Sequence, residues 1–255
     1  MTKLDINGNH VWTNETTNEA FWNDIIINKD GNLRVVGSLG SNIGNTIDNS
    51  SLCGVINPNT GVFLVLKSFT IGFREILNRI YINPLPNNTA FPYYVVGTKT
   101  QSSGSNDDDL AIMTFDNNFN FGIGKIFANT SVDEELFRDA FLGGQNGAIM
   151  TIGNNYDGSS FKGNTLLVNK DLTTASPRYF NQQMIFYSGY SNSNPTGGFY
   201  QVLAGSTTSG SNTVGIILRQ MDFQVYTLIK SPTSGYKLYF PRAFKHYFCN
   251  WSWYF

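Results

Sequence analysis

The sequence predicts an all-β protein built from repeated four-stranded antiparallel sheets. A short apolar run closed by a glycine occurs four times, ending at Gly37, Gly97, Gly153 and Gly205. These glycines lie about 50 to 60 positions apart, and turn sequences and further short apolar runs alternate between them. In an all-β chain, a recurrence of this length is typical of propeller blades. We therefore expect a β-propeller.

Composition limits the classes of partner. The 255 residues are 41% hydrophobic and 14% charged, with a net charge of −1. A near-zero net charge gives no electrostatic reason to expect a nucleic acid or an anionic membrane surface as partner. The first residues lack the apolar core of a signal peptide, and no apolar run is long enough to span a bilayer. The two cysteines, Cys53 and Cys249, favour unpaired thiols over a disulfide.

The first unit shows the expected order of elements. Its strands are predicted at residues 24–27, 33–37, 53–56 and 62–66. Asp30-Gly31-Asn32 is a hairpin turn between the first two strands, and Asn57 to Gly61 is the turn between the last two. Ser38 to Ser51 forms a polar loop between the second and third strands.

The other units repeat this order. In the third unit, Ser131 to Glu134 has capping-box spacing, which predicts a short helical turn from Glu135 to Arg138 before the first strand. The second unit is irregular, and its residues 74–79 can be read as helix. Further strands are predicted at residues 93–97, 110–113 and 119–127, at 139–142, 148–153, 166–169 and 175–180, and at 199–205, 215–221 and 225–229.

The two ends of the chain are out of phase with the units. Lys3 to Trp12 is predicted as the close of a third strand, a turn and a fourth strand, so the chain begins midway through a blade. If residues 236–240 and those after them supply the missing strands, the N- and C-terminal strands pair and close a ring of about five blades, which removes exposed sheet edges. The propeller repeats then cover residues 1–235. Residues 236–255 form an aromatic closing strand or docking tail.

The repeat core resembles the β-propeller repeats of bacterial and phage surface proteins, which carry an S-I-x-x-D-x-x-G-N-x-Y-V-x-G pattern. Asp24 through Gly37 match this pattern, and Asp139 through Gly153 match it more loosely. The resemblance implies a fold rather than an activity. It also suggests a location in a virion or on an extracellular surface.

The loops between second and third strands are the most informative functional feature. They share one phase of the repeat, so in a propeller they would gather on one face. Their neutral Asn, Ser, Gly and Tyr side chains suit glycans or protein partners; ordinary solvated hairpin loops are the alternative. Candidate ligand-binding residues on this face are Asn154, Asn155, Tyr156, Ser102, Asn106 and Asn212.

Acidic residues provide two further candidates. Asp107, Asp108 and Asp109 could hold Ca²⁺ through their carboxylate oxygens, although a solvated loop tip explains them equally simply. No other cofactor is expected. The carboxylates of residues 133–135 and Asp139 invite comparison with a glycosidic acid–base pair. Similar residues recur in the first unit, at Glu19 and Asp24. We therefore interpret the carboxylates of residues 133–135 and Asp139 as a requirement of the fold rather than as catalytic groups.

These observations favour a non-enzymatic structural or binding module within a larger assembly, such as a phage virion or a receptor-facing surface protein. In that interpretation a protein partner docks on the aromatic tail, at Trp251, Trp253, Tyr254 and Phe255. The alternatives are a glycan-binding propeller of a secreted bacterial adhesin and a glycoside-acting propeller enzyme.

Overall fold

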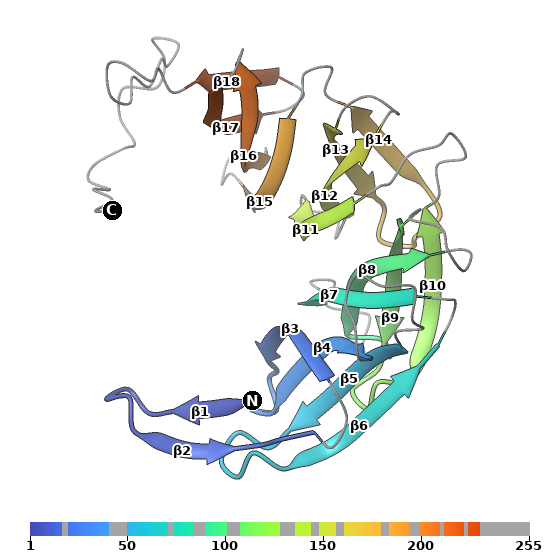
Figure 1. Ribbon diagram of the computed structural model, residues 1–255. Coiled ribbons are helices and arrows are strands. Elements are labelled where there is room, and N and C mark those ends of the chain that lie inside the picture. The colour runs from blue at the N-terminus through green and yellow to red at the C-terminus, as the bar shows by residue number, and fades with distance from the viewer. Residues whose placement is uncertain are drawn as a thin grey trace.

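The computed structural model confirms an all-β architecture of antiparallel four-stranded sheets. It describes residues 1–16, 20–40, 50–70, 74–83, 90–100, 108–127, 136–143, 148–156, 161–179, 184–193, 199–209, 212–221 and 224–229. Every element in these ranges is a strand, and the sheets follow one another along an arc (Figure 1). None of these residues belongs to a helix of the length and apolarity needed to cross a membrane.

Each four-stranded sheet is a meander in which neighbouring strands are consecutive in the chain. We call these sheets blades 1 to 4. Blade 1 contains β3 (Ala20–Ile27), β4 (Leu33–Leu39), β5 (Ser50–Ile56) and β6 (Phe63–Phe69); blade 2 contains β7 (Arg74–Ile82), β8 (Tyr93–Thr100), β9 (Asp108–Phe115) and β10 (Phe121–Phe127). Blade 3 contains β11 (Leu136–Gly143), β12 (Ala148–Tyr156), β13 (Phe161–Val168) and β14 (Ala175–Tyr179); blade 4 contains β15 (Met184–Ser193), β16 (Phe199–Ser209), β17 (Asn212–Met221) and β18 (Gln224–Ile229).

The recurring glycine of each unit lies on the second strand of its blade, opposite a β-bulge on the first strand. In blade 1 the register shifts between Trp22 and Asp24, so that Asn23 has no partner and Trp22 lies opposite Gly37. The bulge turns the carbonyl group of Phe21 toward Gly37, and a Cβ atom there would overlap that oxygen. Gly97 and Gly205 meet the corresponding carbonyl oxygens in blades 2 and 4. The motif therefore ends in glycine because the neighbouring backbone leaves no room for a side chain.

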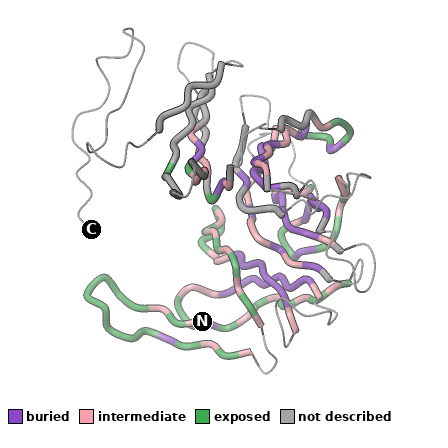
Figure 2. The backbone as a smooth tube through the Cα atoms, turned by 45° about the horizontal axis from the view of Figure 1, so that its top comes forward, coloured by how far each residue is buried: buried purple, intermediate pink, exposed green. Residues whose placement is uncertain are grey.

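The core lies between blades. One cluster joins blades 1 and 2 through residues such as Val36, Cys53, Ile80 and Val95, and another joins blades 2 and 3. Central strands are buried on both faces, as the purple tube of Figure 2 shows for β4, β5 and β8. Cys53 is a free, fully buried thiol, and Cys249 lies outside the described residues.

Three expectations about local structure were wrong. Residues 74–79 belong to strand β7, and Leu136 to Arg138, expected in a helical turn, belong to strand β11. The four loops expected between second and third strands, at residues 38–51, 98–109, 154–165 and 206–213, are shorter than predicted. The strands extend into them, for example to Tyr156 in β12 and from Phe161 in β13. Cross-strand pairing over these residues satisfies backbone groups that isolated polar loops would leave to water. Strand β15 was not predicted at all.

The N-terminal hairpin is a two-stranded sheet whose strands and turn lie where the sequence predicts them. Strands β1 (Thr2–Leu4) and β2 (His10–Thr13) form a two-stranded sheet. Their turn matches the β9–β10 turn of blade 2: the Asp5 carboxylate accepts the backbone N–H of Asn9 and its amide, just as Asp116 accepts those of Asn120. The strands that were expected to complete this sheet, residues 236–240 and beyond, lie outside the described residues.

Candidate functional site

The first strands of the four blades lie side by side on the concave side of the arc (Figure 1). Strand β3 contacts β7, β7 contacts β11, and β11 contacts β15. Each of these strands carries a bulge at the same register, opposite the recurring glycine or next to it. Bulges re-aim side chains and occur often beside active sites. We call the bulge residues and those that follow them the bulge ring: Asn23–Asp24, Asn78–Arg79, Arg138–Asp139 and Tyr187–Ser188.

In blade 1 the bulge ring holds the neighbouring blade through hydrogen bonds. Asp24 Oδ2 accepts the backbone N–H of Ile80 at 3.0 Å, and Asn23 Nδ2 donates to the Leu77 carbonyl oxygen at 2.8 Å. Asp24 Oδ1 lies 3.7 Å from the Arg79 guanidinium, and the two side chains remain 21% and 37% exposed. The Asp24 carboxylate is thus fixed in orientation while one edge remains open to solvent.

In blade 4 the bulge is held from blade 3. The backbone N–H of Phe186 donates to Asn154 Oδ1 at 3.0 Å, and both side chains are buried. The extra residue of this bulge, Tyr187, is 57% exposed, and its hydroxyl group lies 3.1 Å from Ser206 Oγ.

A second polar cluster lies at the end of blades 1 and 2 where the second-to-third-strand connections emerge. Ser51 Oγ donates to Glu75 Oε2 at 3.1 Å, and Asp109 lies on β9 of the same blade as Glu75. All three side chains are 1% exposed or less, so they lie between the blades rather than on the concave surface. Within the described ranges, no three His, Cys, Asp or Glu residues are grouped so that they could hold a metal ion.

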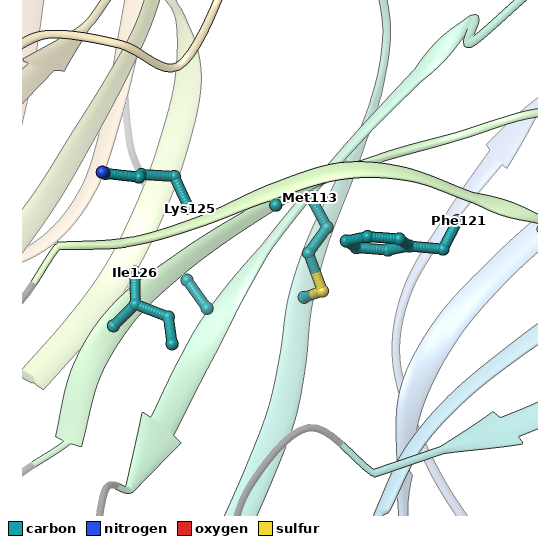
Figure 3. Close-up of a pocket in the computed structure, with 6 residues that line it drawn as sticks. Met113, Phe121, Lys125 and Ile126 are labelled. Carbon is teal, nitrogen blue, oxygen red and sulfur yellow. The ribbon is translucent and has the colours of Figure 1, made fainter.

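A hollow of about 320 Å³ lies at the outer part of blade 2, on β9 and β10 (Figure 3). Met113, Phe121 and Ile126 line it together with Ala111, and Lys125 points away from them. The lining is apolar and carries no pair of polar groups that could fix a ligand. We therefore do not regard it as the functional site.

The structure describes four of the six ligand-binding residues expected from the sequence. Asn154 is a buried strand residue that contacts blade 4, and its Nδ2 has no hydrogen-bond partner. Asn155 and Tyr156 end β12, and Asn212 begins β17. Ser102, Asn106 and Asp107 lie outside the described residues, as do Trp251, Trp253, Tyr254 and Phe255. Asp108 begins β9, and the side chain of Asp109 is buried between blades rather than on a loop tip.

Sequence reasoning missed Arg79 and Tyr187. The signal that identifies them is a polar pair that follows a large apolar residue in each unit: Trp22-Asn-Asp, Leu77-Asn-Arg, Phe137-Arg-Asp and Phe186-Tyr-Ser. The four pairs come into one column when the units are aligned on these large apolar residues. The irregular spacing between pair and glycine hid the column.

Comparisons with known proteins identify the fold. No family model and no curated protein matches the chain. Among solved structures, an α-L-arabinofuranosidase from Fusarium graminearum in complex with an iminosugar inhibitor superposes with a TM-score of 0.53 at 10% identity. The match covers 83% of this chain, which spans only 66% of that enzyme's length.

Two further solved structures are more distant. A GH43 β-1,3-galactosidase matches with a TM-score of 0.44 at 13% identity, over 89% of this chain and 48% of that one. An endo-arabinase from Bacteroides thetaiotaomicron matches with a TM-score of 0.40 at 8% identity, over 86% of this chain and 90% of that one.

These findings correct our functional expectation. The solved structures that superpose with a TM-score above 0.5 are those of an α-L-arabinofuranosidase, so the prediction of a non-enzymatic structural or binding module was wrong. They agree with the expected β-propeller, whereas no family model supports the resemblance to phage and bacterial surface repeats.

Proposed function

We propose that the protein cleaves glycosidic bonds on the concave side of the arc, with Asp24 and Asp139 as its carboxylate pair. The observation that carries this proposal is their position. Both aspartates directly follow the bulge of an innermost strand, in blades 1 and 3. The fold shared with an arabinofuranosidase agrees with this chemistry.

Glycosidic hydrolysis requires two carboxyl groups on opposite sides of the scissile bond. Asp24 accepts two backbone N–H groups, from Ile25 and Ile80, and lies beside the Arg79 guanidinium. These contacts fix the orientation of the carboxyl group, so Asp24 suits the carboxylate that removes a proton from water or attacks the anomeric carbon. Asp139 then donates its proton to the leaving-group oxygen as the C–O bond breaks. Water supplies the hydroxyl group of the new hemiacetal: either it attacks directly and gives its proton to Asp24, or it cleaves the glycosyl ester formed on Asp24 and gives its proton to Asp139.

The test is hydrolysis of a panel of nitrophenyl glycosides that includes the α-L-arabinofuranoside. We expect the wild-type chain to release nitrophenol, and Asp24→Asn and Asp139→Asn each to reduce kcat by about 10²-fold or more. Asp171→Asn, in the turn before β14 and away from the concave side, is the control and should keep wild-type activity. Equal activity of all four proteins would refute the assignment, and absence of hydrolysis across the panel would refute the function.

We also propose that the sheet begun by β1 and β2 is completed by residues 236–240 and those that follow, which would give five closed blades. Three observations support this: the hairpin is only half a blade, its β1 edge has no described partner, and the neighbouring Ile25 and Ile27 are 48% and 69% exposed. Hydrogen exchange tests it. Amide groups of β1 should be protected in the wild type and lose protection in Leu238→Pro, which removes one strand N–H. Unprotected amides in the wild type would exclude closure.

A further inference from the structure

Tyr187 differs from the residues at equivalent positions of the bulge ring. The extra residue of the bulge is Asn23 in blade 1, Asn78 in blade 2 and Arg138 in blade 3. Only blade 4 places an aromatic ring there. Its side chain is 57% exposed, although a tyrosine normally buries most of its ring.

The ring is held firmly in spite of its exposure. Its hydroxyl group lies 3.1 Å from Ser206 Oγ on the neighbouring strand β16. The residue before it, Phe186, is fully buried, and the buried Asn154 side chain accepts the Phe186 N–H group. Both neighbours therefore fix the backbone and the ring, which reduces the entropy that a ligand must overcome on binding.

The position of Tyr187 relates it to the proposed carboxylates. Strand β15 contacts β11, and β11 carries Asp139 at the same register of its own bulge. Tyr187 thus belongs to the innermost strand of the blade next to the one that carries Asp139, and this strand lies on the concave side of the arc (Figure 1).

We propose that Tyr187 is the stacking platform for a sugar ring in the substrate, an inference that rests on the proposed function. The apolar C–H face of a furanose or pyranose lies against the phenol ring, and the hydroxyl pair of Tyr187 and Ser206 accepts and donates hydrogen bonds at the edge of the sugar. Pockets of this kind combine an apolar surface with a few fixed polar groups. Tyr187 is thus a positioning residue for a neutral saccharide.

The experiment measures binding without turnover. In an Asp139→Asn background, titration calorimetry gives the Kd of arabinotriose and galactotriose, one furanose and one pyranose probe. Tyr187→Ala should weaken binding of the preferred probe about tenfold, the loss expected when one stacked face is removed. Tyr187→Phe keeps the ring and should bind within about threefold of the parent.

Phe121→Ala is the matched control, because Phe121 is a similarly exposed aromatic residue (53%) on the outer strand β10. It should leave the Kd unchanged. Equal affinity of Tyr187→Ala and its parent, or a parent that binds neither probe, overturns the inference. Failure of the proposed function alone has a different signature: the parent binds saccharide, Tyr187→Ala does not, and the wild type hydrolyses no glycoside.

Discussion

The two faces of blade 1 are covered to different extents. The face toward blade 2 is closed by an apolar cluster that includes Val36 and Cys53, and by the hydrogen bonds of Asp24 and Ser51. The face toward the N-terminal hairpin is covered only in its outer part, where Trp12 packs on Val35 and Ile56. Its inner part leaves Ile25 and Ile27 exposed.

Polar anchors differ between the faces as well. On the face toward blade 2, the buried Arg34 guanidinium pairs with Asp30 at 2.7 Å and lies over the Tyr93 ring. On the opposite face, Trp12 Nε1 and Lys3 Nζ both donate to the carbonyl oxygen of Pro58. A four-stranded neighbour thus covers blade 1 from its inner to its outer strand, whereas the two-stranded hairpin covers only the outer strands. Four substitutions test this.

The largest loss of stability is expected at Gly37. Strand β4 lies close to β3 at this glycine, and both faces of blade 1 depend on that pairing. In Gly37→Ala the new methyl group overlaps the Phe21 carbonyl oxygen, and backbone cannot yield as a flexible side chain can. We expect a loss of about 4 kcal/mol or more in the free energy of unfolding, measured by denaturant titration. Gly215→Ala, with no atom near its Cβ position, is the control and should change stability by about 1 kcal/mol at most.

Next in size is Trp12→Ala, which removes the cover from the outer half of the open face. The side chain is 7% exposed, so we expect a loss of about 3 kcal/mol in a denaturant titration. The neighbouring Val11 is 44% exposed, and Val11→Ala should cost less than about 0.5 kcal/mol. Equal losses for the two would mean that the hairpin does not pack on blade 1.

A smaller loss of stability tests whether the inner strand of blade 1 is covered on the face toward the N-terminal hairpin. If residues 236–240 and beyond close the ring over Ile27, Ile27→Ser loses an apolar contact and should cost about 1 to 2 kcal/mol. Ile123→Ser, at a residue of comparable exposure on the outer strand β10, should cost less than about 0.5 kcal/mol. Identical thermal midpoints for the two variants would show that the inner half of this face stays open in solution.

The smallest effect concerns pH and the face toward blade 2. Burial raises the pKa of the Asp30 carboxyl group, but hydrogen bonds from Arg34 and Asn32 and the charge of Arg34 outweigh burial and hold the pKa below the ordinary 3.8. A lowered pKa stabilises the fold above about pH 4, and this stabilisation is lost as pH falls through the folded-state pKa. Because the Asp30 side chain is 42% exposed, Asp30→Asn should cost only about 0.5 kcal/mol at pH 7.

Denaturant titrations at pH 7 and at acidic pH check whether the stabilisation by Asp30 is lost as the pH falls. The difference in unfolding free energy between wild type and Asp30→Asn should shrink as the pH falls below about 4 and disappear once the pH lies below the folded-state pKa. A difference that persists there would mean that packing, rather than charge, accounts for the role of Asp30.

The sequence alone determined the features that depend on neighbouring residues. Apolar runs of strand length, the turns at Asp5 and Asn28, and the period of the glycines predicted strands, hairpins and blades, because each is fixed by local backbone preferences. The two-stranded hairpin at residues 2–13 also followed from the order of its strand and turn signals. The phase of the second-to-third-strand connections was predicted for the same reason, although their lengths were not.

Only the tertiary structure decided what depends on residues far apart in the chain. Residues 74–79 have a helix-like pattern, yet pairing with β8 makes them strand. The sequence predicts Asn154 in a loop, yet its buried side-chain oxygen Oδ1 accepts the backbone N–H of Phe186 in the next blade. The bulge ring forms because a carbonyl group on one strand faces a glycine on the neighbouring strand. Such a contact between strands produces no hydrophobic periodicity in the sequence of either strand.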